Sequence, residues 1–140
     1  MQKILIADDH EVMRHGLVQI LQEEYPLAQI EEAGNGLELV SLARKADWTF
    51  IITDISMPLL NGFEALIQIR KFLPDIPILV LSMHSDEHYC CTAFKAGASG
   101  YVTKSMAQNE LIKAVKKIMS GKMYIPEALV IKNRRDKHDS

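Results

Sequence analysis

The sequence contains little of what defines several other classes of protein. Cysteine is scarce: the 140 residues include only Cys90 and Cys91, and two adjacent cysteines cannot close a disulfide loop around a domain. No cysteine–histidine spacing of the zinc type is present either, so we expect a protein of a reducing, cytoplasmic compartment. An excess of one charge sign is also missing. The net charge of −2 argues against binding nucleic acid through bulk positive charge.

Long hydrophobic runs are absent as well. The apolar stretches are shorter than ten residues, whereas a membrane-spanning helix needs about 20. Only three residues precede the first apolar run at Ile4, too few for a signal peptide. With 48% hydrophobic and 24% charged residues, the composition predicts one soluble globular domain with its own core and no membrane partner.

Short apolar runs alternate with helical patterns along the chain. The runs lie at 4–7, 28–33, 50–52, 78–81 and 100–102, and helices are predicted near 10–24, 36–46, 61–72, 86–97 and 106–120. Asn35, Asn61 and Ser105 each precede a Glu or Gln by three residues, which predicts helix N-caps. Five strand–helix repeats predict an α/β fold, namely a five-stranded, doubly wound parallel sheet with helices on both faces.

Polar residues follow the predicted strands, where open α/β sheets bind ligands. The first strand is followed by Asp8-Asp9 and the fifth by Lys104, while the third ends at Asp54 and the fourth at Ser82; the 28–33 run, expected at the side of the sheet, adds no ionisable group. Three carboxylates repel one another, so Lys104 and a hard cation such as Mg²⁺ are expected to offset their charge.

Each of these residues also has an ordinary structural interpretation when taken alone. Asp9 could be a helix cap, Asp54 and Ser82 could start turns, and Lys104 could be solvated. His10, beside the acid pair, could indicate a softer metal site, but a solvated helix residue is the favoured interpretation. The joint pattern at one edge of the sheet favours function.

The combination resembles the receiver domain of two-component response regulators. The matching segments are Asp8-Asp9, Asp54 with Met57-Pro58 and Asn61-Gly62, Ser82, and 96–104, within a match from about residue 3 to about 122. Residues 9–17, 81–84 and 120–125 are similar to the NarL/FixJ subfamily, whose output is a LuxR-type helix-turn-helix. The resemblance implies a flavodoxin-like strand order 2-1-3-4-5. It also implies a receiver domain over 1–122 and a linker over 123–140 toward an output domain absent from this chain.

The resemblance also implies roles for single residues. Asp54 would accept a phosphoryl group from a sensor histidine kinase, with Mg²⁺ held by Asp8, Asp9, Asp54 and the backbone carbonyl of Ser56. Lys104 and Ser82 would bind the phosphate, and Tyr101 would turn inward as Ser82 moves. This switch would alter the face formed by helix 86–97, strand 100–102 and helix 106–120, a possible homodimer surface. The family often has a proline after a cis peptide bond where Ser105 stands here.

The implied protein is a phosphoacceptor rather than an enzyme, and it would reach DNA only through the output domain. A stand-alone receiver that acts by protein contacts is the main alternative. A phosphatase with an aspartyl-phosphate intermediate would need a second Asp where Ser56 stands. A flavin binder would need a phosphate-cradling loop where Asp8-Asp9 stands. The end of the chain is expected to hold a short helix start at 127–131 and a polar tail at 132–140.

Overall fold

The computed structural model describes residues 2–126 of the chain. The elements alternate as β1 (Lys3–Ala7), α1 (Glu11–Glu24), β2 (Gln29–Ala33), α2 (Gly36–Ala43), β3 (Phe50–Asp54), α3 (Gly62–Phe72), β4 (Ile78–Ser82), α4 (Glu87–Ala96), β5 (Gly100–Thr103) and α5 (Ala107–Met119). The strands form one sheet in the order β2-β1-β3-β4-β5, and every neighbouring pair is parallel. The predicted fold class and strand order are therefore confirmed. The proposed helix start at 127–131 and the tail at 132–140 lie outside the described residues.

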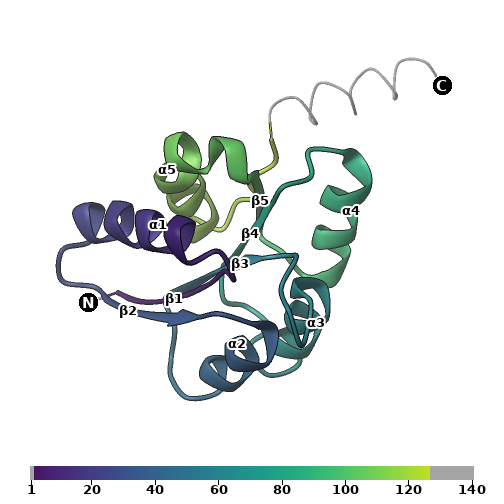
Figure 1. The fold of residues 1–140 in the computed structure, drawn as a ribbon, viewed down its shortest axis with the longest axis horizontal. Coiled ribbons are helices and arrows are strands. Elements are labelled where there is room, and N and C mark those ends of the chain that lie inside the picture. Colours follow the sequence, from purple (N-terminus) through teal and green to yellow (C-terminus); the bar gives the residue numbers. More distant parts are fainter. Residues whose placement is uncertain (1, 127–140) are drawn as a thin grey trace.

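The helices cover both faces of the sheet, with α1 and α5 on one face and α2, α3 and α4 on the other (Figure 1). Alternate residues of each central strand enter different cores. Ile4 and Ile6 of β1 pack with Leu17 and Leu111, while Leu5 packs on the opposite side in the core that contains Leu39 and Leu66. Burial on both faces explains why these strands are continuously apolar in the sequence.

Two of the three predicted helix caps are present. Asn35 Oδ1 accepts a hydrogen bond from the Glu38 amide at 2.8 Å, and Asn61 Oδ1 accepts one from the Glu64 amide at 2.9 Å. The cap predicted at Ser105 is wrong. A 3₁₀ turn over Lys104–Met106 precedes α5, and its Ala107 N–H donates to the Lys104 carbonyl, so no side chain caps the helix.

The chain after α5 returns to the edge of β5. Tyr124 forms a single parallel β-bridge with Gly100, its amide donates to the Ser99 carbonyl at 3.1 Å, and its carbonyl accepts from the Tyr101 amide at 3.0 Å. The Tyr124 hydroxyl donates to Glu110 Oε2 at 2.9 Å. The first residues of the expected linker are thus attached to the sheet.

The helices of the described region, residues 2–126, are all too short or too polar to cross a bilayer.

A close backbone approach positions the end of β3. A Cβ atom added at Gly62 would lie 2.2 Å from the Asp54 carbonyl oxygen, so a larger residue would push α3 away from the strand. The Gly62 amide donates to the Ile55 carbonyl at 2.6 Å, which closes the turn that follows Asp54. The Asn61-Gly62 pair therefore both starts α3 and fixes the strand end that carries Asp54.

Candidate functional site

Four strand ends deliver polar side chains to one edge of the sheet, as the sequence predicted. Asp8 follows β1, Asp54 ends β3, Ser82 ends β4, and Lys104 follows β5. All four are buried, with at most 6% of the residue surface exposed. Buried polar groups of this kind are costly unless they are paired, so their contacts define the site.

The Lys104 ammonium lies at the centre of this cluster. Its Nζ atom is 2.8 Å from Asp54 Oδ2, 3.0 Å from Asp8 Oδ1 and 2.8 Å from His10 Nδ1. Burial raises the pKa of Asp54 above its usual range, and the hydrogen bond from Lys104 offsets only part of this effect. Burial alone would lower the pKa of Lys104, but the hydrogen bonds to Asp54 and Asp8 together raise it. Each partner of the pair therefore favours the charged form of the other inside a buried site.

Asp8 and Asp9 play different structural parts. Asp8 Oδ1 accepts from the His10 amide at 2.9 Å, whereas Asp8 Oδ2 is buried and has no hydrogen-bond partner. Asp9 is partly exposed, with 32% of its side chain accessible. The N-cap of α1 is His10 and no side chain caps this helix, so Asp9 is not the helix cap that was its alternative interpretation.

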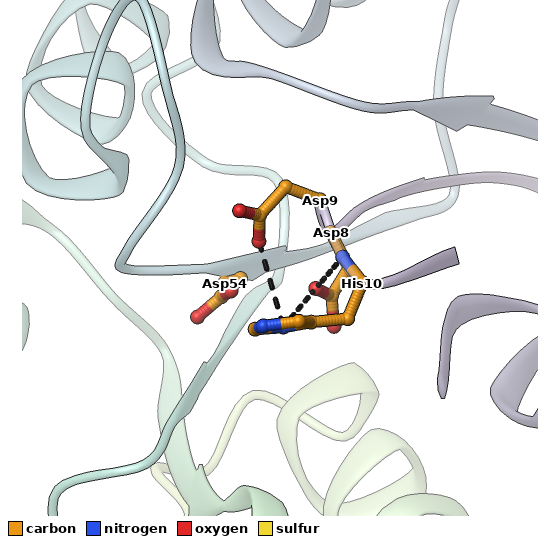
Figure 2. Close-up of side chains that lie close together, drawn as sticks. All are labelled: Asp8, Asp9, His10 and Asp54. Atoms are coloured by element: carbon orange, nitrogen blue, oxygen red, sulfur yellow. Dashed lines mark hydrogen bonds and ion pairs between the residues drawn. The ribbon is translucent and has the colours of Figure 1, made fainter. Parts of the chain in front are cut away.

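The acidic cluster has the dimensions of a divalent cation site. Asp8, Asp9, His10 and Asp54 each offer one ligand atom, and these atoms all lie within 4.8 Å of one another (Figure 2). Octahedral coordination with bonds of about 2.1 Å places neighbouring ligand atoms about 3.0 Å apart and opposite ones about 4.2 Å apart. The unpartnered Asp8 oxygen gives such an ion a buried anionic ligand. The residues present therefore fit a bound metal.

Ser82, Tyr101 and the loop after β4 form one connected unit. Ser82 Oγ accepts from the His84 amide at 2.9 Å, and the Tyr101 hydroxyl donates to the His84 carbonyl. Tyr101 is fully buried, and burial raises its pKa to about 12. The His84 ring stacks on Tyr89 with centroids 3.8 Å apart. Ser82 and Tyr101 thus both hold the backbone of His84.

Ser56 lies at the exposed start of the turn after β3. Its amide donates to Asp54 Oδ1 at 3.3 Å, so the residue expected to offer a carbonyl ligand also touches Asp54 directly. This contact leaves both oxygens of Asp54 with a hydrogen-bond partner, Ser56 on one and Lys104 on the other.

Two features of the site were missed in the sequence. His10 is exposed to solvent, as expected, but it precedes α1 rather than lying in it, and its ring contacts Lys104, Asp8 and Asp9. Glu32 of β2 lies outside the acidic cluster, as expected, but it positions Arg14 beside it. Arg14 donates to Glu32 Oε1 at 2.9 Å and to the Asp8 carbonyl at 2.6 Å, which fixes the backbone beside the site. Arg14, four residues after His10, was the one sign in this segment of the sequence that a cation could lie beside Asp8.

Comparison with known proteins agrees with this arrangement. Residues 4–116 match the family model of the response regulator receiver domain, which is most of the chain. The chain belongs to this receiver family. Among relatives, the receiver is 40% identical to the transcriptional regulatory protein DegU of Brevibacillus brevis, over 88% of this chain and 52% of that protein. It is 36% identical to the nitrate/nitrite response regulator NarL of Escherichia coli K12, over 90% of this chain and 58% of that protein.

Solved structures give the same result. The receiver superposes on a LuxR-family two-component response regulator from Aurantimonas sp. SI85-9A1 with a TM-score of 0.85, at 31% identity and 96% coverage of both chains. The non-phosphorylated receiver domain of RcsB from Escherichia coli gives a TM-score of 0.79 at 27% identity, over 90% of this chain and 98% of that one. The receiver therefore has relatives that are LuxR-family regulators, and it spans between half and three-fifths of the length of the two curated relatives.

Proposed function

We propose that this receiver domain accepts a phosphoryl group on Asp54 from the phosphohistidine of a sensor histidine kinase, with Mg²⁺ bound at the acidic cluster. The observation that carries the proposal is the buried contact of Asp54 with Lys104, flanked by Asp8 and Asp9. Phosphoryl transfer needs positioned positive charge around the transferring group more than it needs covalent chemistry. At this edge, Lys104 would supply part of that positive charge. A divalent ion held by the carboxylate cluster would supply the rest.

Asp54 is better placed for attack than the other two aspartates. Asp8 and Asp54 are both buried, but Asp54 directly precedes Ile55 and Ser56, which line a surface groove. Asp9 has no contact with Lys104 among the described hydrogen bonds and ion pairs. A groove of about 520 Å³ lies beside Asp9 and the turn that directly follows Asp54, and its lining includes Ser56, Pro58 and Asn61. This groove gives a phosphodonor a route to the end of β3.

The proposed reaction replaces a phosphorus–nitrogen bond with a phosphorus–oxygen bond. A carboxylate oxygen of Asp54 attacks phosphorus, the bond to the donor imidazole breaks, and the leaving nitrogen takes a proton. Asp8, Asp9, Asp54 and the Ser56 carbonyl would hold Mg²⁺, which would neutralise charge on the phosphoryl oxygens. Lys104 would exchange its contact with Asp54 for a phosphoryl oxygen, and the Ser82 hydroxyl would donate to another. The resulting mixed anhydride hydrolyses, which resets the signal.

The proposed output passes through Ser82 and Tyr101. When Ser82 Oγ turns toward the phosphoryl group, its contact with the His84 amide changes, and His84 also accepts the bond from Tyr101. Tyr101 is inward in this structure, so we propose that phosphorylation stabilises an arrangement which the unmodified domain already populates. The affected face is α4–β5–α5, which would serve a homodimer or an output domain. In a longer protein, a LuxR-type DNA-binding domain would convert this change into transcriptional control.

The approach of the kinase is proposed to use a second groove. A groove of about 570 Å³ adjoins Lys104 and is lined partly by apolar residues of α1 and by Met83. Val12 and Met83 are 88% and 71% exposed, so the groove offers apolar side chains to a partner beside the polar site. A phosphohistidine-bearing helix seated there would bring its phosphoryl group to the edge that holds Asp54.

The test is phosphorylation by a small donor. The parent protein, an Asp54→Asn variant and an Asp47→Asn control would each be incubated with acetyl phosphate and Mg²⁺, and intact mass measured. The parent and the control should gain one phosphoryl group, and Asp54→Asn should gain none. Full mass gain by Asp54→Asn would refute the proposal. Sustained turnover of p-nitrophenyl phosphate would instead favour the phosphatase alternative.

A further inference from the structure

His10 has no part in the proposed phosphoryl transfer, yet its imidazole points into the acidic cluster (Figure 2). Its Nδ1 atom lies 3.3 Å from Asp8 Oδ1, 3.5 Å from Asp9 Oδ1 and 2.8 Å from Lys104 Nζ. Nδ1 is close to the positively charged Lys104, so in this arrangement it acts as an acceptor and offers a lone pair to a cation.

The Lys104 ammonium shows where a cation binds in this cluster. Three acceptors from three different segments converge on its Nζ atom, namely Asp8 Oδ1, Asp54 Oδ2 and His10 Nδ1. A second, independent observation is Asp8 Oδ2, a fully buried carboxylate oxygen with no hydrogen-bond partner. The cluster therefore holds one cation already and keeps one anionic oxygen for another.

We infer that His10 Nδ1 is a nitrogen ligand of the metal site, and that it makes the site favour Co²⁺, Ni²⁺ or Zn²⁺ over Mg²⁺. The inference rests on the proposed metal site and adds a ligand and a selectivity to it. An all-oxygen cluster suits Mg²⁺, whereas an imidazole strengthens the binding of later transition metals far more than that of Mg²⁺. One histidine among three aspartates would thus change which ion binds best.

The geometry allows this ligation with small movements. Neighbouring ligands of an octahedral ion lie about 3.0 Å apart, and the two Nδ1–carboxylate distances exceed that by only a few tenths of an ångström. The His10 side chain is 60% exposed, so the ring has room to adjust. Lys104 would lose its contact with His10 Nδ1 and would share the carboxylates of Asp8 and Asp54 with the metal.

The first test compares affinities for two metals. Calorimetry would give the dissociation constants of Ni²⁺ and Mg²⁺ for the parent, for His10→Ala and for His15→Ala, a matched control on α1 whose ring lies near Glu11 and Glu32. His10→Ala should weaken Ni²⁺ at least about tenfold and change Mg²⁺ by less than about twofold. His15→Ala should leave both unchanged. Equal changes for Ni²⁺ and Mg²⁺ in His10→Ala would show that His10 is no ligand and would overturn the inference.

The second test observes the nitrogen directly. The parent loaded with Co²⁺ should show paramagnetically shifted imidazole proton signals, which His10→Ala should lack and His15→Ala should keep. An Asp9→Asn variant should weaken both Ni²⁺ and Mg²⁺, because the two ions share the cluster. Ni²⁺ binding that survives Asp9→Asn unchanged would place the nickel site elsewhere and would overturn the inference. Failure of the proposed function is separate, since it would appear as phosphorylation of the Asp54→Asn variant.

Discussion

Lys104 Nζ lies 2.8 Å from Asp54 Oδ2 although 50 residues separate them, and both side chains are almost completely buried. The contact joins the end of β3 to the turn after β5 across β4. It means that the ammonium is already in place before any phosphoryl group arrives. The same ammonium also occupies oxygens of Asp8 and Asp54 that a metal would use.

Replacement of Lys104 by Met should therefore have opposite effects on two measurements. Phosphorylation by acetyl phosphate should slow at least about tenfold, because positive charge at the transferring oxygens is lost. Mg²⁺ should bind more tightly, because the competing ammonium is gone. Intact mass over time and calorimetry would measure the two effects.

The control for this prediction is Lys113→Met, an exposed lysine on α5. It should match the parent in both measurements. Unchanged phosphorylation in Lys104→Met would contradict the role assigned to the ion pair, as would weaker Mg²⁺ binding.

Arg70 should be a major determinant of stability at the edge of the sheet where β4 and β5 begin, opposite the acidic cluster. Its guanidinium donates to the carbonyls of Gly97, Leu73 and Ile76, and to Ser99 Oγ. Arg70→Ala would leave these partly buried acceptors unpaired, so we expect a loss of about 2–4 kcal/mol in the free energy of unfolding. Urea denaturation would measure it. The exposed neighbour Lys71→Ala is the control, and a difference between them below about 0.5 kcal/mol would disprove the role of Arg70.

The adjacent cysteines should react very differently. Cys90 is buried and burial raises its pKa to about 11, whereas Cys91 is exposed. At about pH 8 only about one Cys90 thiol in a thousand is ionised, and its thiolate is the reactive form. Ellman's reagent should therefore modify Cys91 rapidly in a Cys90→Ala variant. A Cys91→Ala variant should react slowly, at a rate that rises about tenfold per pH unit below pH 11. Similar rates for the two variants near pH 8 would contradict the burial of Cys90.

Tyr124 should stabilise the domain although it lies beyond α5. Tyr124→Phe removes the hydrogen bond to Glu110 and should lower the free energy of unfolding by about 1 kcal/mol. Tyr124→Ala also empties a buried position and should lower it by about 3 kcal/mol. Thermal or urea unfolding would show the order, with half-exposed Met123→Ala as the neutral control. Tyr124→Ala as stable as Met123→Ala would mean that this segment is not attached in solution.

The helices could be predicted closely because their signals are local. Four of the five begin and end within one residue of the predicted positions, and only α2 ends three residues early, at Ala43. Asn35 and Asn61 identify helix starts through bonds to amides three residues away. The failure at Ser105 has a local cause too, since a 3₁₀ turn satisfies the first amide of α5 without a side chain. The strand order came from the family resemblance, because periodicity does not fix which strands are neighbours.

The missed features depend on contacts between distant segments. His10 was interpreted as solvated because the sequence does not show that its backbone is extended and turns the ring toward Lys104, 94 residues away. Arg14 meets Glu32 only because β1 and β2 are neighbours. Arg70 binds residues of the β4–β5 region up to 29 positions away. The carboxylates and Lys104 were found because each directly follows or ends a strand, a relation that the sequence does show.

The central claim is that Asp54, rather than Asp8 or Asp9, receives the phosphoryl group. The most direct measurement is chemical mapping of the modified residue. The protein would be treated with acetyl phosphate and Mg²⁺, the acyl phosphate reduced with labelled borohydride, and the labelled peptide sequenced by mass spectrometry. We predict that the reduction converts phosphorylated Asp54 to labelled homoserine. Asp8 and Asp9 should remain unlabelled. Label on Asp8 or Asp9, or on any residue while Asp54 stays unmodified, would contradict the assignment.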